Sequence, residues 1–269
     1  MRFKILSLFV AIQVLSFGIW ANLGGAQAAP VPKVPDYPEI HRAPALPSSS
    51  LPLHFATRNM EQEKRFLNAI KQNQIETALK KLPEHHAKSV KNIILDYSQL
   101  AHRGLGGNSM IILRAVNMGT EEMVGVLIHE VAHNVDYADL IPDEEIHKSV
   151  FRDGKMTLYE TDPSLDFYRI SWLSNTQRKK TATNMDFVSG YAMSDPFEDF
   201  AESYVFYVLH NKDFKALAAS SEALYAKYRF IKYEVFGGRE FDTGDGRVKD
   251  NQRPWDITVL RYNINEFLS

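Results

Sequence analysis

The sequence of 269 residues contains no cysteine. Disulfide bonds and thiolate metal sites are therefore excluded, and any metal site would have to use His, Asp or Glu. Neither sign of charge is in excess, because the formal net charge is −2. A basic surface for nucleic acid is thus not indicated. Internal repeats are also absent, and the composition is typical of a globular protein.

The N-terminus has the three parts of a secretory signal peptide. Arg2 and Lys4 provide positive charge, residues 5–20 are mostly apolar, and residues 26–28 (Ala-Gln-Ala) form a small-x-small cleavage site. An uncleaved membrane anchor is the alternative, but the apolar run is short for a spanning helix, which needs ~20 residues. The lack of cysteine argues against a lipid anchor. We therefore predict a signal peptide over residues 1–28 and a secreted or periplasmic protein, with no stable membrane insertion after cleavage.

A proline-rich segment follows the predicted signal peptide. Residues 29–52 contain seven prolines, which favours an extended spacer. Residues 53–269 are then expected to fold as one catalytic domain. Hydrophobic periodicity and turn residues predict helices at 61–82, 120–135, 195–210 and 222–236, strands at 92–97 and 110–116, and a loop at 104–107.

The motif His-Glu-x-x-His lies within the expected helix at 120–135, at residues 129–133. One helical turn separates His129 from His133, so both imidazoles can reach one zinc ion. Glu130 projects beside them, where it can take a proton from a metal-activated water and pass it to a leaving amine. Two structural histidines are the alternative, but burying them side by side without a ligand would be costly. The motif therefore predicts a zinc-dependent peptidase site.

A catalytic zinc needs a third protein ligand, for which the sequence offers three candidates. Asp139 stands at the spacing of metzincin peptidases, although Asp136 replaces the glycine at which their chain turns. Glu160 has no supporting pattern. Glu198 shares a helix face with Glu202, four residues later, so that one carboxylate can bind metal while the other holds a ligand histidine by its far nitrogen. We therefore favour Glu198.

Helix capping is the competing interpretation of Glu198. Asp195 followed three residues later by a glutamate resembles a capping box, and a capping Glu198 would turn to the helix start. Capping accounts for only one of the two acids on this face, since Glu202 lies beyond the first turn. A cation or hydrogen-bond donors are needed opposite the pair.

Two segments carry a resemblance to a known family. Residues 129–137 read H-E-V-A-H-N-V-D-Y, and residues 190–203 read G-Y-A-M-S-D-P-F-E-D-F-A-E-S. Together they resemble the gluzincin metallopeptidases, and among these the anthrax lethal factor catalytic domain family. No other lethal factor domain is recognisable, so neither toxicity nor a signalling-kinase substrate is carried over.

The resemblance implies an α+β, zincin-like fold that is mainly helical with a small mixed sheet. It also implies that zinc is bound by His129, His133 and Glu198, and that Glu130 acts as general base.

The resemblance also assigns roles to three further residues. Glu202 matches an outer-shell acid, and Asp136 matches a family aspartate that follows the second histidine. Tyr191, seven residues before the expected glutamate ligand, matches a tyrosine that assists at the oxyanion or the leaving group. Without the resemblance, Tyr191 would be interpreted as a packing aromatic.

The sequence thus predicts an exported zinc metalloendopeptidase that acts on proteins or peptides. One alternative is a zinc-stabilised extracytoplasmic binding protein without peptidase activity, although a structural site would not need Glu130. The other is a hydrolase of cell-wall peptides. An aromatic cluster at 167–172 either lines the cleft or packs in the core. The aspartic-peptidase signature at 241–244 has no second copy, so a turn is expected there.

Overall fold

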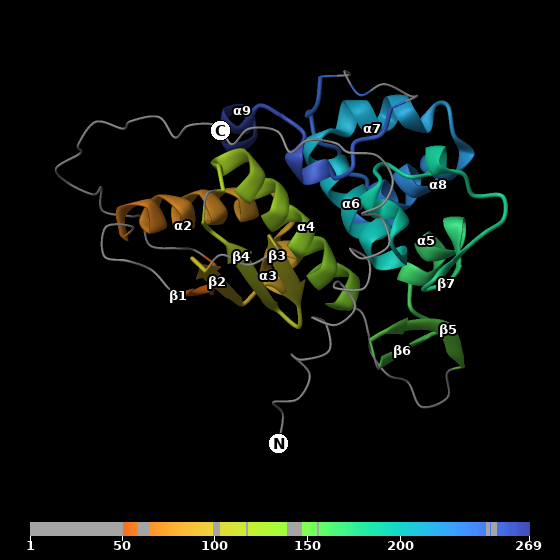
Figure 1. The fold of residues 1–269 in the computed structure, drawn as a ribbon, viewed down its shortest axis with the longest axis horizontal. Coiled ribbons are helices and arrows are strands. Elements are labelled where there is room, and N and C mark those ends of the chain that lie inside the picture. Colours follow the sequence, from red (N-terminus) through yellow and green to blue (C-terminus); the bar gives the residue numbers. More distant parts are fainter. Residues whose placement is uncertain are drawn as a thin grey trace, which may run out of the picture.

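A computed structural model of the chain describes residues 51–58, 65–98, 103–116, 118–138, 147–154, 156–245, 248 and 252–269. The expected signal peptide, nearly all of the expected spacer and the candidate ligand Asp139 lie outside these ranges. The described residues form an α+β fold that is mainly helical, which confirms the predicted class (Figure 1). None of the described helices is both long and apolar enough to cross a membrane.

The main sheet has four strands in the order β1-β2-β4-β3. Strands β1 (His54–Arg58), β2 (Asn92–Asp96) and β4 (Met110–Arg114) are parallel, and β3 (Gly104–Gly107) runs antiparallel at the edge beside β4. Strands β2 and β4 confirm the two predicted strands. Their central residues are buried apolar side chains, as expected for strands covered on both faces.

The loop predicted at residues 104–107 is wrong, because this segment is strand β3. A tight turn joins β3 to β4 through Asn108 and Ser109, whose φ angles of 51° and 61° suit a two-residue hairpin. Glycine weakens strands by propensity, but here the glycines allow a close approach to a helix. A Cβ atom on Gly106 would lie 2.5 Å from the carbonyl oxygen of Glu130.

Helix α4 (Thr120–Ala138) packs against the sheet and carries the His-Glu-x-x-His motif. Its residues Val124, Leu127, Ile128 and Val131 are fully buried, as the helical spacing predicts. Helix α2 (Arg65–Lys80) and helix α3 (Glu84–Ser89) pack on α4 as well. The sheet side of the molecule thus fixes the orientation of the motif.

Helix α6 (Pro196–Leu209) lies beside α4 and is surrounded by the other helices of the C-terminal half (Figure 1). Asp195 caps it by accepting hydrogen bonds from the backbone N–H groups of Phe197 and Glu198, both at 2.9 Å. Every residue from Glu198 to Leu209 is buried. The predicted helix at 195–210 is confirmed, and its polar side chains must find partners inside the protein.

The remaining elements complete this half of the fold. Helix α8 (Glu222–Phe230) and the π-helical turn η4 (Ile231–Val235) confirm the helix predicted at 222–236. The other elements are β5 (Lys148–Asp153), β6 (Met156–Tyr159), α5 (Ser164–Ser171), β7 (Trp172–Ser174), β8 (Gln177–Arg178), η2 (Asn184–Asp186), η3 (Tyr191–Met193), α7 (Asn211–Ala218), η5 (Ile257–Val259) and α9 (Ile264–Leu268).

The aromatic cluster at 167–172 belongs to the core. Phe167, Tyr168 and Trp172 are each at most 2% exposed. The ring of Phe167 packs edge-to-face on Phe200 of α6 at 5.3 Å between centroids. Core packing is therefore confirmed for these rings, and the alternative that they line a cleft is wrong.

Candidate metal centre

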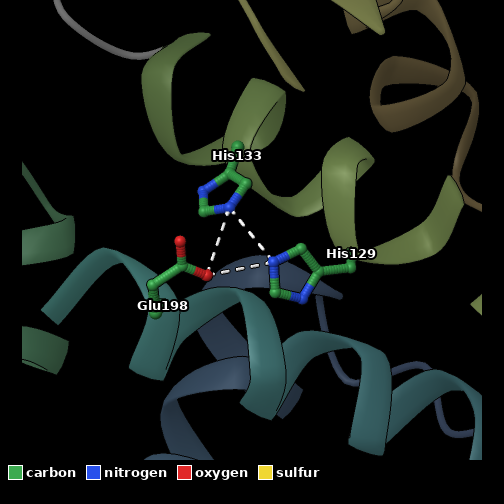
Figure 2. A group of neighbouring side chains, drawn as sticks. All are labelled: His129, His133 and Glu198. Atoms are coloured by element: carbon green, nitrogen blue, oxygen red, sulfur yellow. Dashed lines mark hydrogen bonds and ion pairs between the residues drawn. The ribbon is translucent and has the colours of Figure 1, made fainter. Parts of the chain in front are cut away.

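Helices α4 and α6 bring three donor groups together: His129, His133 and Glu198 (Figure 2). The Nε2 atom of His129 lies 3.1 Å from Glu198 Oε2 and 3.2 Å from the Nε2 atom of His133. The third side of the triangle, from His133 Nε2 to Glu198 Oε2, measures 3.6 Å. Among the described residues, this is the group of His and acidic side chains that could hold a metal ion.

The triangle has the dimensions of a zinc site. Zinc bonds to nitrogen and oxygen of about 2.05 Å place neighbouring donors of a tetrahedron ~3.3 Å apart. The three separations of 3.1, 3.2 and 3.6 Å scatter around that value. Three protein donors also leave the fourth position of a tetrahedron for substrate or water, which is the arrangement of catalytic zinc sites. The residues present therefore fit the ion.

The electrostatics of the cluster favour a positive charge between the donors. Burial lowers the pKa of His129, but hydrogen bonds to Glu198 and Glu202 outweigh it and raise the pKa well above its usual range. Burial would raise the pKa of Glu198, yet the two histidines hold it far below its usual range. The carboxylate is thus ready to bind a cation without first losing a proton.

Glu202 fixes the far side of His129. Its Oε1 atom lies 3.0 Å from Nδ1 of His129, which leaves Nε2 pointing at the other two donors. Its Oε2 atom accepts hydrogen bonds from the hydroxyl of Ser189 at 2.6 Å and from the backbone N–H of Ile257 at 2.9 Å. Such outer partners set the tautomer and the orientation of a ligand histidine. Ser189 and Ile257 were missed by the sequence analysis.

The side chain of Glu198 does not return to cap its own helix. The cap is provided by Asp195 alone, while the Glu198 carboxylate faces the two histidines. Its second oxygen, Oε1, accepts a hydrogen bond from the hydroxyl of Tyr191 at 3.1 Å. The ring of Tyr191 also stacks on the ring of His129, with centroids 6.0 Å apart and planes at 28°. The structure therefore brings Tyr191 to the cluster.

Glu130 is buried between the cluster and strand β3. A Cβ atom on Gly104 would lie 2.3 Å from Oε1 of Glu130, so the carboxylate occupies the space that glycine leaves. Burial raises the pKa of Glu130 above its usual value, although both histidines and the Gly106 N–H oppose the shift. A carboxylate with a raised pKa is a stronger base near neutral pH. The glycines of β3 therefore belong to the site, which the sequence analysis did not foresee.

Two sequence candidates lie apart from the donor triangle. Asp136 accepts a hydrogen bond from Tyr168 of α5 at 2.5 Å, and no hydrogen bond joins it to His133. Its position three residues beyond His133 rotates it toward α5 rather than over the second histidine. Glu160 forms an exposed ion pair with Arg169 at 2.5 Å.

Residues 253–258 form a segment, here called the C-terminal strap, that lies along the site. The backbone N–H groups of Gly190 and Tyr191 donate to the carbonyl oxygens of Pro254 and Trp255 at 2.9 and 2.6 Å. A salt bridge from Arg103, the residue just before β3, holds Asp256 of the strap. The strap therefore ties the Tyr191 turn to the sheet side of the molecule.

The site and fold together define a zinc metallopeptidase, and a family comparison agrees. Residues 114–250, just over half of the chain, match the model of a family described as "Putative zinc-binding metallo-peptidase". The chain therefore belongs to this family of zinc-binding metallopeptidases. The matched region contains the whole donor triangle, whereas strand β3 and the C-terminal strap lie outside it. Neither the curated proteins nor the solved structures contain a match to this chain.

Proposed function

We propose that this protein is an exported endopeptidase of the gluzincin type, in which His129, His133 and Glu198 hold a catalytic zinc ion. The observation that carries the proposal is the triangle of three donors at tetrahedral spacing with a buried carboxylate, Glu130, beside it. A purely structural site would be closed by four protein ligands and would not need that carboxylate.

Zinc bound at this triangle would acidify a water molecule and polarise the carbonyl of a peptide bond. Glu130 would take the proton of the attacking water and deliver it to the leaving amine. Its buried position suits this role, because burial raises its pKa above the usual value and makes it a stronger base. Glu202 would hold His129 in one tautomer throughout, since Ser189 and the Ile257 N–H already fix its other oxygen.

Tyr191 would donate a hydrogen bond to the carbonyl oxygen of the substrate as negative charge develops there. Burial and the nearby carboxylates of Glu198 and Glu130 raise its pKa above the usual range, so the hydroxyl keeps its proton at neutral pH. In this structure the hydroxyl donates to Glu198. A substrate carbonyl would compete with that acceptor.

Strand β3 offers a way to bind an extended peptide. It is one of the two edge strands of the main sheet and pairs with β4 on one side. A substrate segment that added to its other edge would run beside Glu130, because Gly104 and Gly106 lie directly against that side chain. Backbone pairing would bind peptides of varied sequence, as an endopeptidase requires.

Export and the relation to the lethal factor catalytic domain rest on the sequence. Residues 1–28 have the pattern of a signal peptide, so we propose a secreted or periplasmic location. The spacing of Tyr191, Glu198 and Glu202 matches the lethal factor pattern and supports a relation at the level of the catalytic centre.

The substitution Glu130→Gln tests the proposal. It keeps the shape of the side chain but removes the base, so hydrolysis of a mixed peptide library should fall by about 10²–10⁴-fold. Zinc content and melting temperature should stay at the wild-type level. Glu160→Gln is the matched control, because Glu160 is an exposed acid paired with Arg169. Hydrolysis at the wild-type rate in Glu130→Gln would overturn the assignment of the base.

A further inference from the structure

Trp255 is a large apolar side chain left in solvent beside the candidate metal centre. It is 60% exposed, whereas Trp172, the other described tryptophan, is 2% exposed. An indole has up to about 250 Å² that it can bury against a partner. Trp255 also lies outside the region that matches the family model. Its position therefore calls for an explanation particular to this chain.

The indole ends a row of three rings that begins at a metal ligand. The ring of His129 stacks on Tyr191 at 6.0 Å between centroids, and Tyr191 in turn lies 6.5 Å from Trp255. Exposure rises along this row, since His129 is 6% exposed and Trp255 is 60% exposed. The row therefore leads from the reacting centre to the surface, and a substrate bound at the centre would extend past the indole.

Trp255 is held firmly at its backbone. Its carbonyl oxygen accepts from the N–H of Tyr191, and its neighbour Pro254 accepts from the N–H of Gly190. The indole also covers Gly190 so closely that a Cβ atom there would lie 2.5 Å from the ring atom Cε3. A surface fixed before binding loses little conformational entropy when a ligand arrives.

Two described acids that adjoin the row of rings already have partners. Glu198 interacts with His129 and Tyr191, and Asp256 is held by Arg103 and by Thr258. Neither of these two acids is therefore spare to select a basic side chain. What the ring offers a ligand is its apolar face.

We propose that Trp255 forms one wall of a substrate pocket and selects an apolar, aromatic or aliphatic, side chain close to the scissile bond. This inference rests on the proposed peptidase function and adds a substrate preference to it. One apolar contact of this kind is typically worth 10–200-fold in discrimination between substrates.

The test compares cleavage of a peptide library, randomised around the scissile bond, by the zinc-loaded wild type and three variants. Trp255→Ala should reduce kcat/KM for the preferred apolar peptides by at least about 10-fold. It should change poorly cleaved polar peptides little. Trp255→Phe keeps an aromatic face and should retain most of the preference. Tyr225→Ala removes another aromatic ring that is 54% exposed, on helix α8, and should leave the preference unchanged.

Indole fluorescence gives a second readout that does not depend on turnover. In a Glu130→Gln protein without residues 1–28, titration with a preferred peptide should change the emission, and adding Trp255→Phe should abolish that change, because Trp172 is then the one tryptophan left. This measurement still reports if the alanine variant folds poorly.

The outcomes distinguish the inferred substrate preference from the proposed peptidase function. If the wild type cleaves peptides but Trp255→Ala keeps the same preference, or if the preferred residue is charged, the inference is overturned and the peptidase function stands. If the zinc-loaded wild type neither cleaves nor binds any member of the library, the proposed function fails, and the inference fails with it.

Discussion

Helix α6 carries buried carboxylates on two sides, and they are neutralised in different ways. On one side, Glu198 and Glu202 face His129 and the candidate metal centre. On the other, Asp199 is fully buried against the ammonium group of Lys227, 2.7 Å away, which is fully buried as well. The indole N–H of Trp172 also donates to Asp199, at 2.9 Å.

The difference is between a permanent and a removable counter-charge. Lys227 is part of the chain, so the Asp199 side is complete whenever the protein is folded. The Glu198 side gains its full positive charge only when a metal binds. Both arrangements avoid the high cost of an unpaired buried charge. We therefore expect the first to govern stability under all conditions and the second to make stability depend on zinc.

Replacing Lys227 should have the largest effect on stability. Lys227→Met leaves Asp199 buried without its ion-pair partner, which typically costs about 3–5 kcal/mol in the free energy of unfolding. Urea unfolding measures the loss. The double variant Lys227→Met with Asp199→Asn should recover part of it, since no unpaired charge remains.

A matched control for this prediction is Lys232→Met. Lys232 forms a partly exposed pair with Glu240 at 2.7 Å, and such pairs contribute little to stability. If Lys227→Met also lowers the free energy of unfolding by less than about 1 kcal/mol, Lys227 is not the permanent counter-charge of Asp199 described above.

Removing the metal should reduce stability through the Glu198 side of α6 and leave the Asp199 side unchanged. At a free zinc concentration 1,000 times the dissociation constant, binding adds about 4 kcal/mol of stability. A chelator should therefore lower the melting temperature of the wild type, and added zinc should restore it. In a Glu198→Ala variant the chelator should have little effect. An equal chelator effect in both proteins would place the metal elsewhere.

Weakening the support of a ligand should have an intermediate effect. Glu202→Gln removes the charge that holds His129 and should weaken zinc binding by about 10–100-fold. Ser189→Ala removes one neutral hydrogen bond to Glu202 and should cost less. Competition with a coloured chelator measures both affinities. Wild-type affinity in Glu202→Gln would show that this carboxylate does not support the ligand.

A further prediction, confined to acidic pH, concerns a neutral contact of α6. The buried ring of His86 lies with Nδ1 2.9 Å from the hydroxyl of Tyr204 on α6. Burial, more than the nearby positive charge of other residues, lowers the pKa of His86 from 6.5 to about 3. His86 therefore binds a proton less readily in the folded protein than in the unfolded chain. The stability from this group is complete above pH 6.5 and is lost as the pH falls toward 3.

At pH 5 the loss from His86 should be about 2 kcal/mol. His86→Gln should therefore show a shallower fall in unfolding free energy between pH 7 and pH 5. The free energy of unfolding should still depend on pH in His86→Gln, because burial also lowers the pKa of His210, to about 4. His54→Gln, at an exposed position on strand β1, is the control. An unchanged slope in His86→Gln would contradict the assignment.

The parts of the site whose residues lie on the same helix could be predicted from the sequence. His129 and His133 are one turn apart on α4, and Glu198 and Glu202 are one turn apart on α6. Spacing within a helix converts directly into a shared face. The choice of Glu198 over Glu160 also followed from that spacing, and the structure places Glu198, not Glu160, beside the histidines.

The parts that depend on contacts between distant segments could not be predicted. The N–H of Ile257 holds Glu202, but a backbone group has no signature in the sequence. Strand β3 was interpreted as a loop because its glycines disfavour a strand, whereas the close packing of Glu130 requires them. Trp255 reaches the site only because its segment returns to it from the end of the chain.

The central claim is that His129, His133 and Glu198 bind one zinc ion, and elemental analysis of the purified protein tests it most directly. We predict about one zinc per chain in the wild type and a sharp loss in Glu198→Ala, with Glu160→Ala retaining the wild-type content. Zinc retained in Glu198→Ala, or absent from the wild type even after reconstitution, would contradict the account.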